Sequence, residues 1–270
     1  MTTPRGRPEA ILRPGAAAQA FDVERVPPRE PLAEYVDYHW LVRWDVPVPF
    51  RQQVVPQPRV HLAAESGRLL VHGLSREPFF RTLVGGGHVV GTAFHPAGFR
   101  AFLRTSLATI RDTVRPAGEL LGADDRPAAG TALGTDDTAT AVAAVEDYLQ
   151  ALGPEPDPLA RRLNGLVDLV ATRADLVRAE QLAEEAGVSL RTLQRQFTDY
   201  LGFGPKWVIQ RSRILDAAAA AHEGRPPDWA ALALELGFSD QAHLTRVFTH
   251  VVGSPPATYR RDAGLPRDAD

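Results

Sequence analysis

A short segment occurs twice in the last third of this chain. Residues 182–189 read LAEEAGVS, and fifty residues later residues 232–239 read LALELGFS. Each copy is followed by an arginine between a leucine and a phenylalanine, then by a glycine and a proline, and these positions recur fifty-one residues apart. They are Leu193, Arg195, Phe197, Gly202 and Pro205 in the first copy, and Leu244, Arg246, Phe248, Gly253 and Pro256 in the second. Two copies are too few for a solenoid, so the repeat predicts a pair of similar small modules.

Each copy contains the parts of a helix-turn-helix unit. A first helix ends at Gly187 or Gly237, because glycine readily adopts the left-handed conformation that stops a helix. The second helix begins at an N-cap, which is Ser189 in the first copy and Ser239 or Asp240 in the second. Its inner face holds Leu190, Leu193, Phe197 and Leu201 in the first copy, and Ala242 or Leu244 with Val247 and Phe248 in the second. In such units the second helix enters the major groove of double-stranded DNA.

The outer faces of these second helices carry the candidate DNA contacts. They are Arg191, Thr192, Gln194, Arg195 and Thr198 in the first helix, and Gln241, His243, Thr245, Arg246 and His250 in the second. Arginine can bond both acceptors of guanine, and glutamine suits adenine. Any single arginine here could equally belong to an ordinary solvated face. Arg195 and Arg246, however, occupy the same place in both copies, and a purely structural repeat has no need to keep a solvent-facing arginine, so the pair favours DNA reading.

The whole region after residue 158 has helical patterning, and seven helices are expected. The first carries the stripe Leu159, Leu163, Leu166 and Val170, the second spans 179–186, and the fourth runs from Pro205 into the alanines of 217–221. Asp228 caps the fifth helix, and Pro255-Pro256 starts the last one. Residues 153–158, GPEPDP, interrupt any helix and predict a linker. The expected domains are 1–152, then this linker, 159–261, and a tail of 262–270.

The N-terminal half has a different pattern, typical of an antiparallel sandwich or small barrel with a few helices. Short apolar runs bounded by Pro, Gly or Ser are found at 35–44, 54–56, 59–64, 68–73, 79–83 and 88–94. Residues 1–30 show little periodicity and are expected to be loose. The three glycines at 85–87 are expected to form a hairpin turn, and residues 122–138 are expected to form a loop. Helices are expected near 31–36, at 99–103 and over 140–152, the last either packed on its own domain or pairing with a second copy. The fold class is therefore an α+β two-domain chain.

Composition excludes several classes of protein. The chain has no cysteine, so disulfides, thiolate metal sites and cysteine nucleophiles are ruled out. No apolar run approaches the roughly 20 residues needed to span a bilayer, and no hydrophobic segment follows the charged N-terminus as in a signal peptide. We therefore expect a cytoplasmic protein. A formal net charge of −3 gives little support to non-specific nucleic-acid binding, so affinity for DNA must depend on where the arginines lie.

Residues 160–261 resemble the AraC/XylS-type DNA-binding domain. The matching elements are LA, GVS, LQRQF and GFGP within 182–205, and GFSDQAHLTRVF at 237–248 followed by Pro256 and Tyr259-Arg260. The resemblance implies that helices 189–201 and 240–252 enter successive major-groove segments, about 34 Å apart, on DNA that usually bends. It assigns base contacts to Arg191, Gln194 and Arg195, and to Ala242, His243 and Arg246. Ala242 departs from the polar residues often found there, so the second half-site is expected to be read more weakly.

The same resemblance implies a transcription regulator rather than an enzyme. Its expected partners are promoter DNA, RNA polymerase, a small-molecule effector and a second copy of the chain, with no cofactor and no membrane. The sequence leaves both activator and repressor open. In the connecting helix, Arg211 or Arg213 is expected to touch phosphate or an acidic neighbour. Residues 32–122 more loosely resemble uncharacterised N-terminal domains found ahead of such modules, which sense a ligand or dimerise.

Two alternative interpretations concern the N-terminal half. Its five histidines, at 39, 61, 72, 88 and 95, could with Glu65 form a metal site in a cupin-like barrel, which would make this half an enzyme or binding module targeted to DNA. They lack ligand-like spacing, so satisfied or surface histidines are the default. The aromatic residues Trp40, Trp44, Phe79, Phe80 and Phe94 could line an apolar pocket, but an ordinary core is the preferred interpretation.

Overall fold

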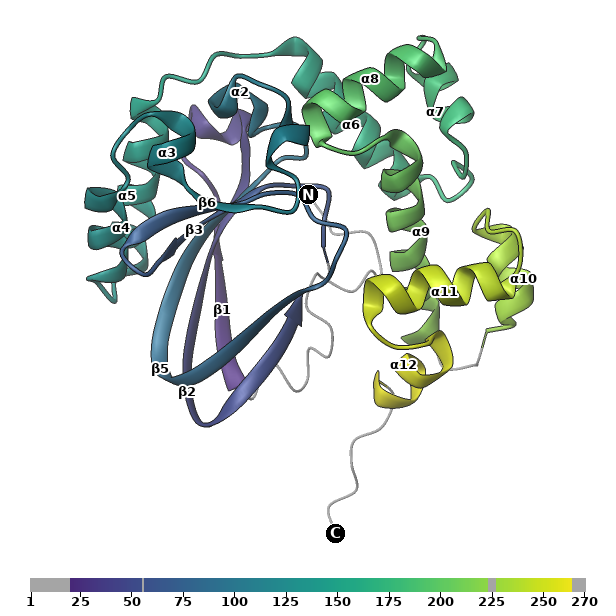
Figure 1. Ribbon diagram of the computed structural model, residues 1–270, viewed down its shortest axis with the longest axis horizontal. Coiled ribbons are helices and arrows are strands. Elements are labelled where there is room, and N and C mark those ends of the chain that lie inside the picture. Colours follow the sequence, from purple (N-terminus) through teal and green to yellow (C-terminus); the bar gives the residue numbers. More distant parts are fainter. Residues whose placement is uncertain (1–19, 55, 223–226, 264–270) are drawn as a thin grey trace.

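The computed structural model describes residues 20–54, 56–222 and 227–263. A β-rich N-terminal half stands beside an all-helical C-terminal half, as expected for an α+β two-domain chain (Figure 1). Helices α3, α4 and α5 lie on one side of the sheet, and the C-terminal helices lie on the other (Figure 1).

The strands form one curved antiparallel sheet in the order β1-β2-β5-β3-β4-β6. Their bounds are Phe21–Val26 for β1, Val36–Val54 for β2, His61–Glu65 for β3, Arg68–His72 for β4, Phe79–Phe94 for β5 and Val114–Pro116 for β6. The antiparallel prediction is confirmed, and the strands make a single sheet with β1 and β6 at its edges. Residues 21–26 were expected to be loose, but they pair along their whole length with β2. The remainder of that expectation, for residues 1–19, lies outside the described residues.

The predicted hairpin turn at residues 85–87 is wrong. These glycines lie inside β5, opposite Val46, Asp45 and Trp44 of β2. A Cβ on Gly87 would lie 2.8 Å from Cζ2 of Trp44, so glycine is required because the indole lies across the strand. The sequence alone could not distinguish a glycine that turns the chain from one that makes room for a neighbour's ring.

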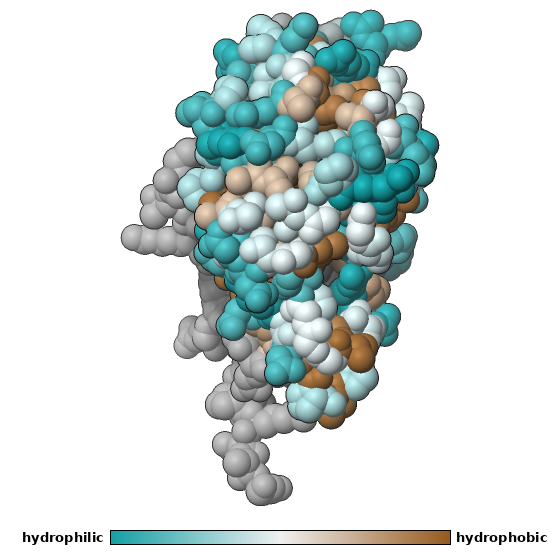
Figure 2. Space-filling model, turned by 90° about the vertical axis from the view of Figure 1, so that its left-hand side faces the viewer, coloured by the Kyte–Doolittle hydropathy of each residue, from teal (hydrophilic) through white to brown (hydrophobic). Residues whose placement is uncertain are grey.

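Helices α3 (Ala117–Leu121), α4 (Arg126–Leu133) and α5 (Thr138–Ala151) bury their apolar faces in the N-terminal core. The expectation of a loop over 122–138 is wrong for α4, whose Ala129 and Ala132 are fully buried in that core. Tertiary burial stabilises this short helix despite its proline and glycine. The apolar stripe of α5 packs on its own domain, and the outer side of α4 and α5 is largely hydrophilic, with hydrophobic side chains in small groups (Figure 2).

The two shorter expected helices are also present, as η1 (Leu32–Glu34) and α2 (Arg100–Leu103). A further short helix, η2 (Leu107–Ile110), was not expected. Between α5 and the next helix, residues 152–157 form no helix or strand.

Seven helices make up the described C-terminal half, as predicted. They are α6 (Pro158–Thr172), α7 (Ala179–Glu185), α8 (Leu190–Leu201), α9 (Pro205–His222), α10 (Trp229–Glu235), α11 (Gln241–Val252) and α12 (Pro256–Ala263). One apolar cluster joins α6, α7, α8 and the start of α9, and a second joins the rest of α9 with α10, α11 and α12. The long helix α9 therefore connects two helix-turn-helix units (Figure 1).

The two halves interlock at the turn after α8. Phe203 is buried in the N-terminal core, although it belongs to the helical half. Gly202 has a φ of +70°, and a Cβ there would lie 3.0 Å from Cδ1 of Leu74. In the opposite direction, Ala97 is buried in the first cluster of the helical half.

Candidate nucleic-acid interface

Helix α8 is positioned by its cap and its buried face. Oγ of Ser189 accepts a hydrogen bond from the backbone N–H of Thr192 at 3.2 Å, which satisfies one of the free donors of the first turn. Leu193 and Phe197 are fully buried, so the opposite face must point to solvent. That face exposes Arg191, Gln194, Arg195 and Thr198. Thr192 is half-buried, because its hydroxyl lies 2.9 Å from Oγ of Ser189 within the cap.

Helix α11 repeats this arrangement with a different cap. Of the two candidates, Asp240 is the N-cap residue, and its Oδ1 accepts a hydrogen bond from the backbone N–H of His243 at 2.7 Å. This bond lowers the pKa of the Asp240 carboxyl, so the cap is charged. Gly237 precedes the helix with a φ of +79°, and a Cβ there would lie 2.6 Å from Cβ of Val177. The turn of the second unit is thus packed against the segment that leads into α7.

The predicted contact residues of α11 differ in their surroundings. Gln241, Ala242 and Arg246 are exposed, whereas His243 and Thr245 are half-buried. Nδ1 of His243 lies 3.1 Å from Oγ of Ser239, so its ring helps to hold the turn. His250 faces the N-terminal half, with Nε2 at 3.4 Å from Oε1 of Glu77. Fewer polar side chains are therefore available on α11 than on α8.

Three exposed arginines of these two helices form no hydrogen bond or ion pair within the described part of the chain. Among the described residues, no hydrogen bond, ion pair or ring contact engages the side chains of Arg191, Arg195 or Arg246. By contrast, Arg173 in the same domain pairs with both Asp175 and Glu185, at 2.6 and 2.7 Å. An arginine without a protein partner keeps its five donors for a ligand, and phosphate or guanine fits that geometry.

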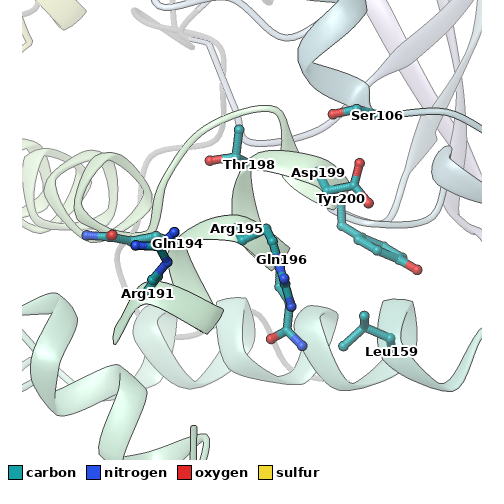
Figure 3. A pocket seen from close by; sticks show the side chains of 9 residues that line it. All are labelled: Ser106, Leu159, Arg191, Gln194, Arg195, Gln196, Thr198, Asp199 and Tyr200. Carbon is teal, nitrogen blue, oxygen red and sulfur yellow. The ribbon is translucent and has the colours of Figure 1, made fainter. Parts of the chain in front are cut away.

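The outer side of α8 borders an open groove of about 830 Å³. Figure 3 shows Arg191 and Gln194 close together at one end of it and Asp199 and Tyr200 at the other, with Arg195 and Gln196 between them. Ser106, the N-cap residue of η2, also lines the groove, so the N-terminal half reaches the side of this helix. Gln196 was not among the predicted contacts because the helical pattern places it between the inner and outer faces.

Two more cations were missed in the sequence. Lys206, the single lysine of the chain, is exposed near the start of α9, and Arg178 precedes α7. The cationic group of neither residue forms an ion pair or hydrogen bond with a described residue. Both are exposed cations of the helical half.

The arginines of the connecting helix lie inside the protein. Arg211 is 3% exposed, and its Nε donates to the carbonyl oxygen of Pro56 in the N-terminal half. Burial lowers the pKa of Arg211 to about 9. Arg213 is 1% exposed, donates to the carbonyl oxygens of Val170 and Arg173, and pairs with Asp216 at 2.8 Å. The expected acidic neighbour is thus found for Arg213, while Arg211 contacts a backbone carbonyl of the other half.

The concave face of the sheet encloses a second cavity, of about 520 Å³. Trp40, Trp44 and Phe79 line it, so the preferred interpretation of these residues as core is wrong. Phe94 is fully buried in the core, as preferred, and Phe80 is 44% exposed on the outside. The strand alternation correctly separates the two faces but does not reveal that one face remains uncovered.

The histidines of the N-terminal half point to different places. His39 is buried between Thr92 and Glu146, at 2.8 and 3.2 Å, and burial lowers the pKa of its ring. His72 contacts Glu65 at 3.0 Å. Within the described residues, no group of three or more His, Cys, Asp or Glu is arranged to hold a metal ion. The metal-enzyme alternative therefore finds no support in their geometry. No helix in the described ranges is long and apolar enough to cross a membrane.

The C-terminal half has two helix-turn-helix units with exposed arginines on their second helices. These features place it in the class of helix-turn-helix DNA-binding proteins. A family model described as a helix-turn-helix domain matches residues 182–262, and a domain of unknown function (DUF6597) matches residues 24–116. The probable transcription factor PqrA of Proteus vulgaris is 31% identical over 94 residues, which cover 35% of this chain and 76% of PqrA. A putative AraC-like transcription regulator of Streptomyces lividans is 32% identical over 120 residues, 41% of this chain and 39% of that protein. The chain belongs to the family of AraC-type helix-turn-helix transcription regulators.

The matches to these curated relatives cover 35–41% of this chain. The chain spans only 31–39% of the length of several of the curated relatives that it matches, the Streptomyces lividans regulator among them. Among solved structures, the DNA-binding domain of AdpA in complex with a target DNA is 28% identical, with a TM-score of 0.32 over 39% of this chain and 92% of that domain.

Proposed function

We propose that this protein regulates transcription by reading promoter DNA with α8 and α11 in two successive major-groove segments. Arg191, Gln194 and Arg195 contact bases of one segment, and Gln241, Ala242 and Arg246 face the other. Thr192 and His243, which also serve the caps and turns, and Thr198 contact backbone or base edges, whereas His250 lies against Glu77 of the N-terminal half. The N-terminal half modulates this binding through an effector or a second copy of the chain.

One observation supports this proposal above the others. Arg195 and Arg246 occupy equivalent places in two units with equivalent cores, and both are exposed with no hydrogen bond or ion pair to a described residue. Each could form a bidentate pair with guanine, which discriminates against a wrong base by about 1–3 kcal/mol. RNA polymerase is the further partner that activation of a promoter requires. The cytoplasm is the compartment in which bacterial relatives would meet the polymerase.

The test is a gel shift or fluorescence-anisotropy titration with DNA from upstream of the protein's own gene. Arg195→Ala and Arg246→Ala are each expected to weaken specific binding by about 1–3 kcal/mol, the value of a bidentate base contact. Because α8 presents two unpaired arginines and a glutamine, Arg195→Ala is expected to cost more than Arg246→Ala.

The matched control is Arg126→Ala. Arg126 lies on α4, far along the chain from both units, and is 72% exposed, so its loss changes the net charge equally without touching the proposed interface. If Arg195→Ala and Arg246→Ala bind as tightly as the Arg126→Ala variant does, the assignment of the reading residues fails.

A further inference from the structure

The cavity on the concave face of the sheet has the size of a small-molecule site. Its volume of about 520 Å³ falls within the roughly 300–1,000 Å³ that ligand pockets occupy. The residues that form the N-terminal core belong to the opposite face of the sheet and do not fill it, as Leu41, Leu62 and Val90 show. A concave apolar surface of this kind stays in contact with water unless a ligand covers it.

The floor of the cavity is aromatic and is built by two tryptophan–glycine pairs. Trp40 and Trp44 of β2 stand directly opposite Gly91 and Gly87 of β5. A Cβ at Gly91 would lie 2.1 Å from the Trp40 indole and one at Gly87 would lie 2.8 Å from that of Trp44, so both would overlap the rings, and both indoles cover bare backbone of the neighbouring strand. Val42 lies between them on the same face, which makes a continuous apolar strip.

The polar groups around this floor largely compensate one another. Glu65 is the most buried carboxylate of the lining, and it accepts hydrogen bonds from both His72 and Arg81. Arg59 pairs with Asp37. His61 lies edge-on to Trp40, with ring centroids 6.3 Å apart, and its nitrogens make no hydrogen bond to a described residue. Burial lowers the pKa of His61 to about 3, so the ring is neutral near pH 7 and can both donate and accept.

From this arrangement we infer that the cavity binds a planar, uncharged aromatic small molecule, which stacks on Trp40 and Trp44 and forms a hydrogen bond with His61. Stacking on aromatic rings suits a flat molecule better than a flexible chain. Glu65 and Arg59 are already paired with other side chains, which disfavours an ionic ligand beside them.

The rim of the cavity touches the DNA-binding half at three points. The carbonyl oxygen of Pro56 accepts from Arg211 of α9. Nε2 of Gln53 donates to the carbonyl oxygen of Val252 at 2.9 Å, and Glu77 lies 3.4 Å from His250. Pro56 and Glu77 line the cavity themselves. A bound molecule would therefore bias the placement of α9 and α11. This regulatory role rests on the proposed function, whereas binding of the small molecule to the cavity does not.

The test uses the full-length protein without DNA and N-phenyl-1-naphthylamine, a neutral aromatic dye, as the probe. Saturable binding of one dye per chain is expected, with quenching of tryptophan emission. Trp40→Leu and Trp44→Leu keep an apolar cover on the glycines but remove the aromatic plane, so each should weaken binding about fivefold. The control is Phe80→Leu, because Phe80 follows Phe79 and lies on the other face of β5. This variant should bind the dye as the parent does. Thermal unfolding verifies that each variant folds.

Two analogues test the stated chemistry. The 8-sulfonate of the same dye carries an added, negatively charged sulfonate group, and dodecanol is uncharged but flexible, so both should bind at least several-fold more weakly. The inference is overturned by absent saturable binding, by tryptophan variants that bind like Phe80→Leu, or by tighter binding of either analogue. None of these outcomes depends on whether the protein binds DNA.

Discussion

At the scale of single residues, two arginines of one helix show how differently a buried cation can be accommodated. The terminal nitrogens of Arg211 are buried and have no hydrogen-bond partner in the described part of the chain. Arg213 instead joins α9 to the end of α6 through the carbonyl oxygens of Val170 and Arg173 and pairs with Asp216. A buried charge that is poorly paired costs free energy, whereas the loss of a well-bonded one leaves its partners unsatisfied.

We therefore expect opposite effects from two equivalent substitutions. Arg211→Met keeps the volume and removes a poorly solvated charge, so the free energy of unfolding should stay the same or rise. Arg213→Met should lower it by about 2–4 kcal/mol, because buried carbonyl oxygens and Asp216 lose their donor. Urea unfolding followed by circular dichroism measures both, and equal losses in the two variants would contradict this account.

At the scale of elements, the glycine before each recognition helix sets the geometry of the unit. Gly237 adopts a φ of +79°, and Val177 occupies the space that a side chain would need. Gly165, within α6, is exposed and has nothing within 4 Å of its would-be Cβ. Glycine is thus required at the first position and tolerated at the second.

Alanine substitutions at these two sites should have opposite signs. Gly237→Ala is expected to destabilise the protein by more than about 1 kcal/mol, since both the left-handed backbone and the contact with Val177 oppose a Cβ. Gly165→Ala should stabilise it by about 0.5–1 kcal/mol, because alanine favours a helix interior. Melting temperatures of the two variants against the parent decide the matter, and a stable Gly237→Ala protein would show that the turn does not need glycine.

The helical elements were predictable because local signals agree with tertiary packing. Ser189, Asp228 and Gly187 mark helix ends in the sequence, and the buried leucines recur with a helical period. β1 and α4 were not predictable from the sequence. β1 is an edge strand followed by two prolines, and α4 contains a glycine, so the local sequence of each only weakly favours its secondary structure. Their stability comes from pairing with β2 and from burial of Ala129 and Ala132.

The candidate interface was only partly accessible from the sequence for a similar reason. Helical periodicity placed Arg191, Gln194 and Arg195 on the outer face, where the structure has them. It could not show that His250 faces Glu77 or that the His243 ring bonds to Ser239, because those contacts come from other segments. The cavity was equally hidden, as alternation identifies a face of a sheet but not what covers it.

At the scale of the whole molecule, the DNA-binding half is held by the N-terminal half at both of its units. Phe203, directly after α8, is buried in the N-terminal core, and Arg111 and Arg76 lie within 6 Å of its ring. The second unit is contacted through Gln53 and Glu77 on the rim of the aromatic cavity. The relative placement of α8 and α11, on which the reading of two groove segments depends, is thus coupled to the N-terminal half.

The most direct measurement of the central claim is selection of binding sites from random double-stranded DNA by the parent, Arg195→Ala and Arg246→Ala proteins. The parent should select two short conserved elements separated by about one helical turn, 10–10.5 base pairs centre to centre. Each variant should lose preference at one element only, a different one for each arginine, with the element lost by Arg246→Ala being the weaker in the parent. A single uninterrupted element, or variants that select the same sequence as the parent, would contradict reading by two equivalent arginines.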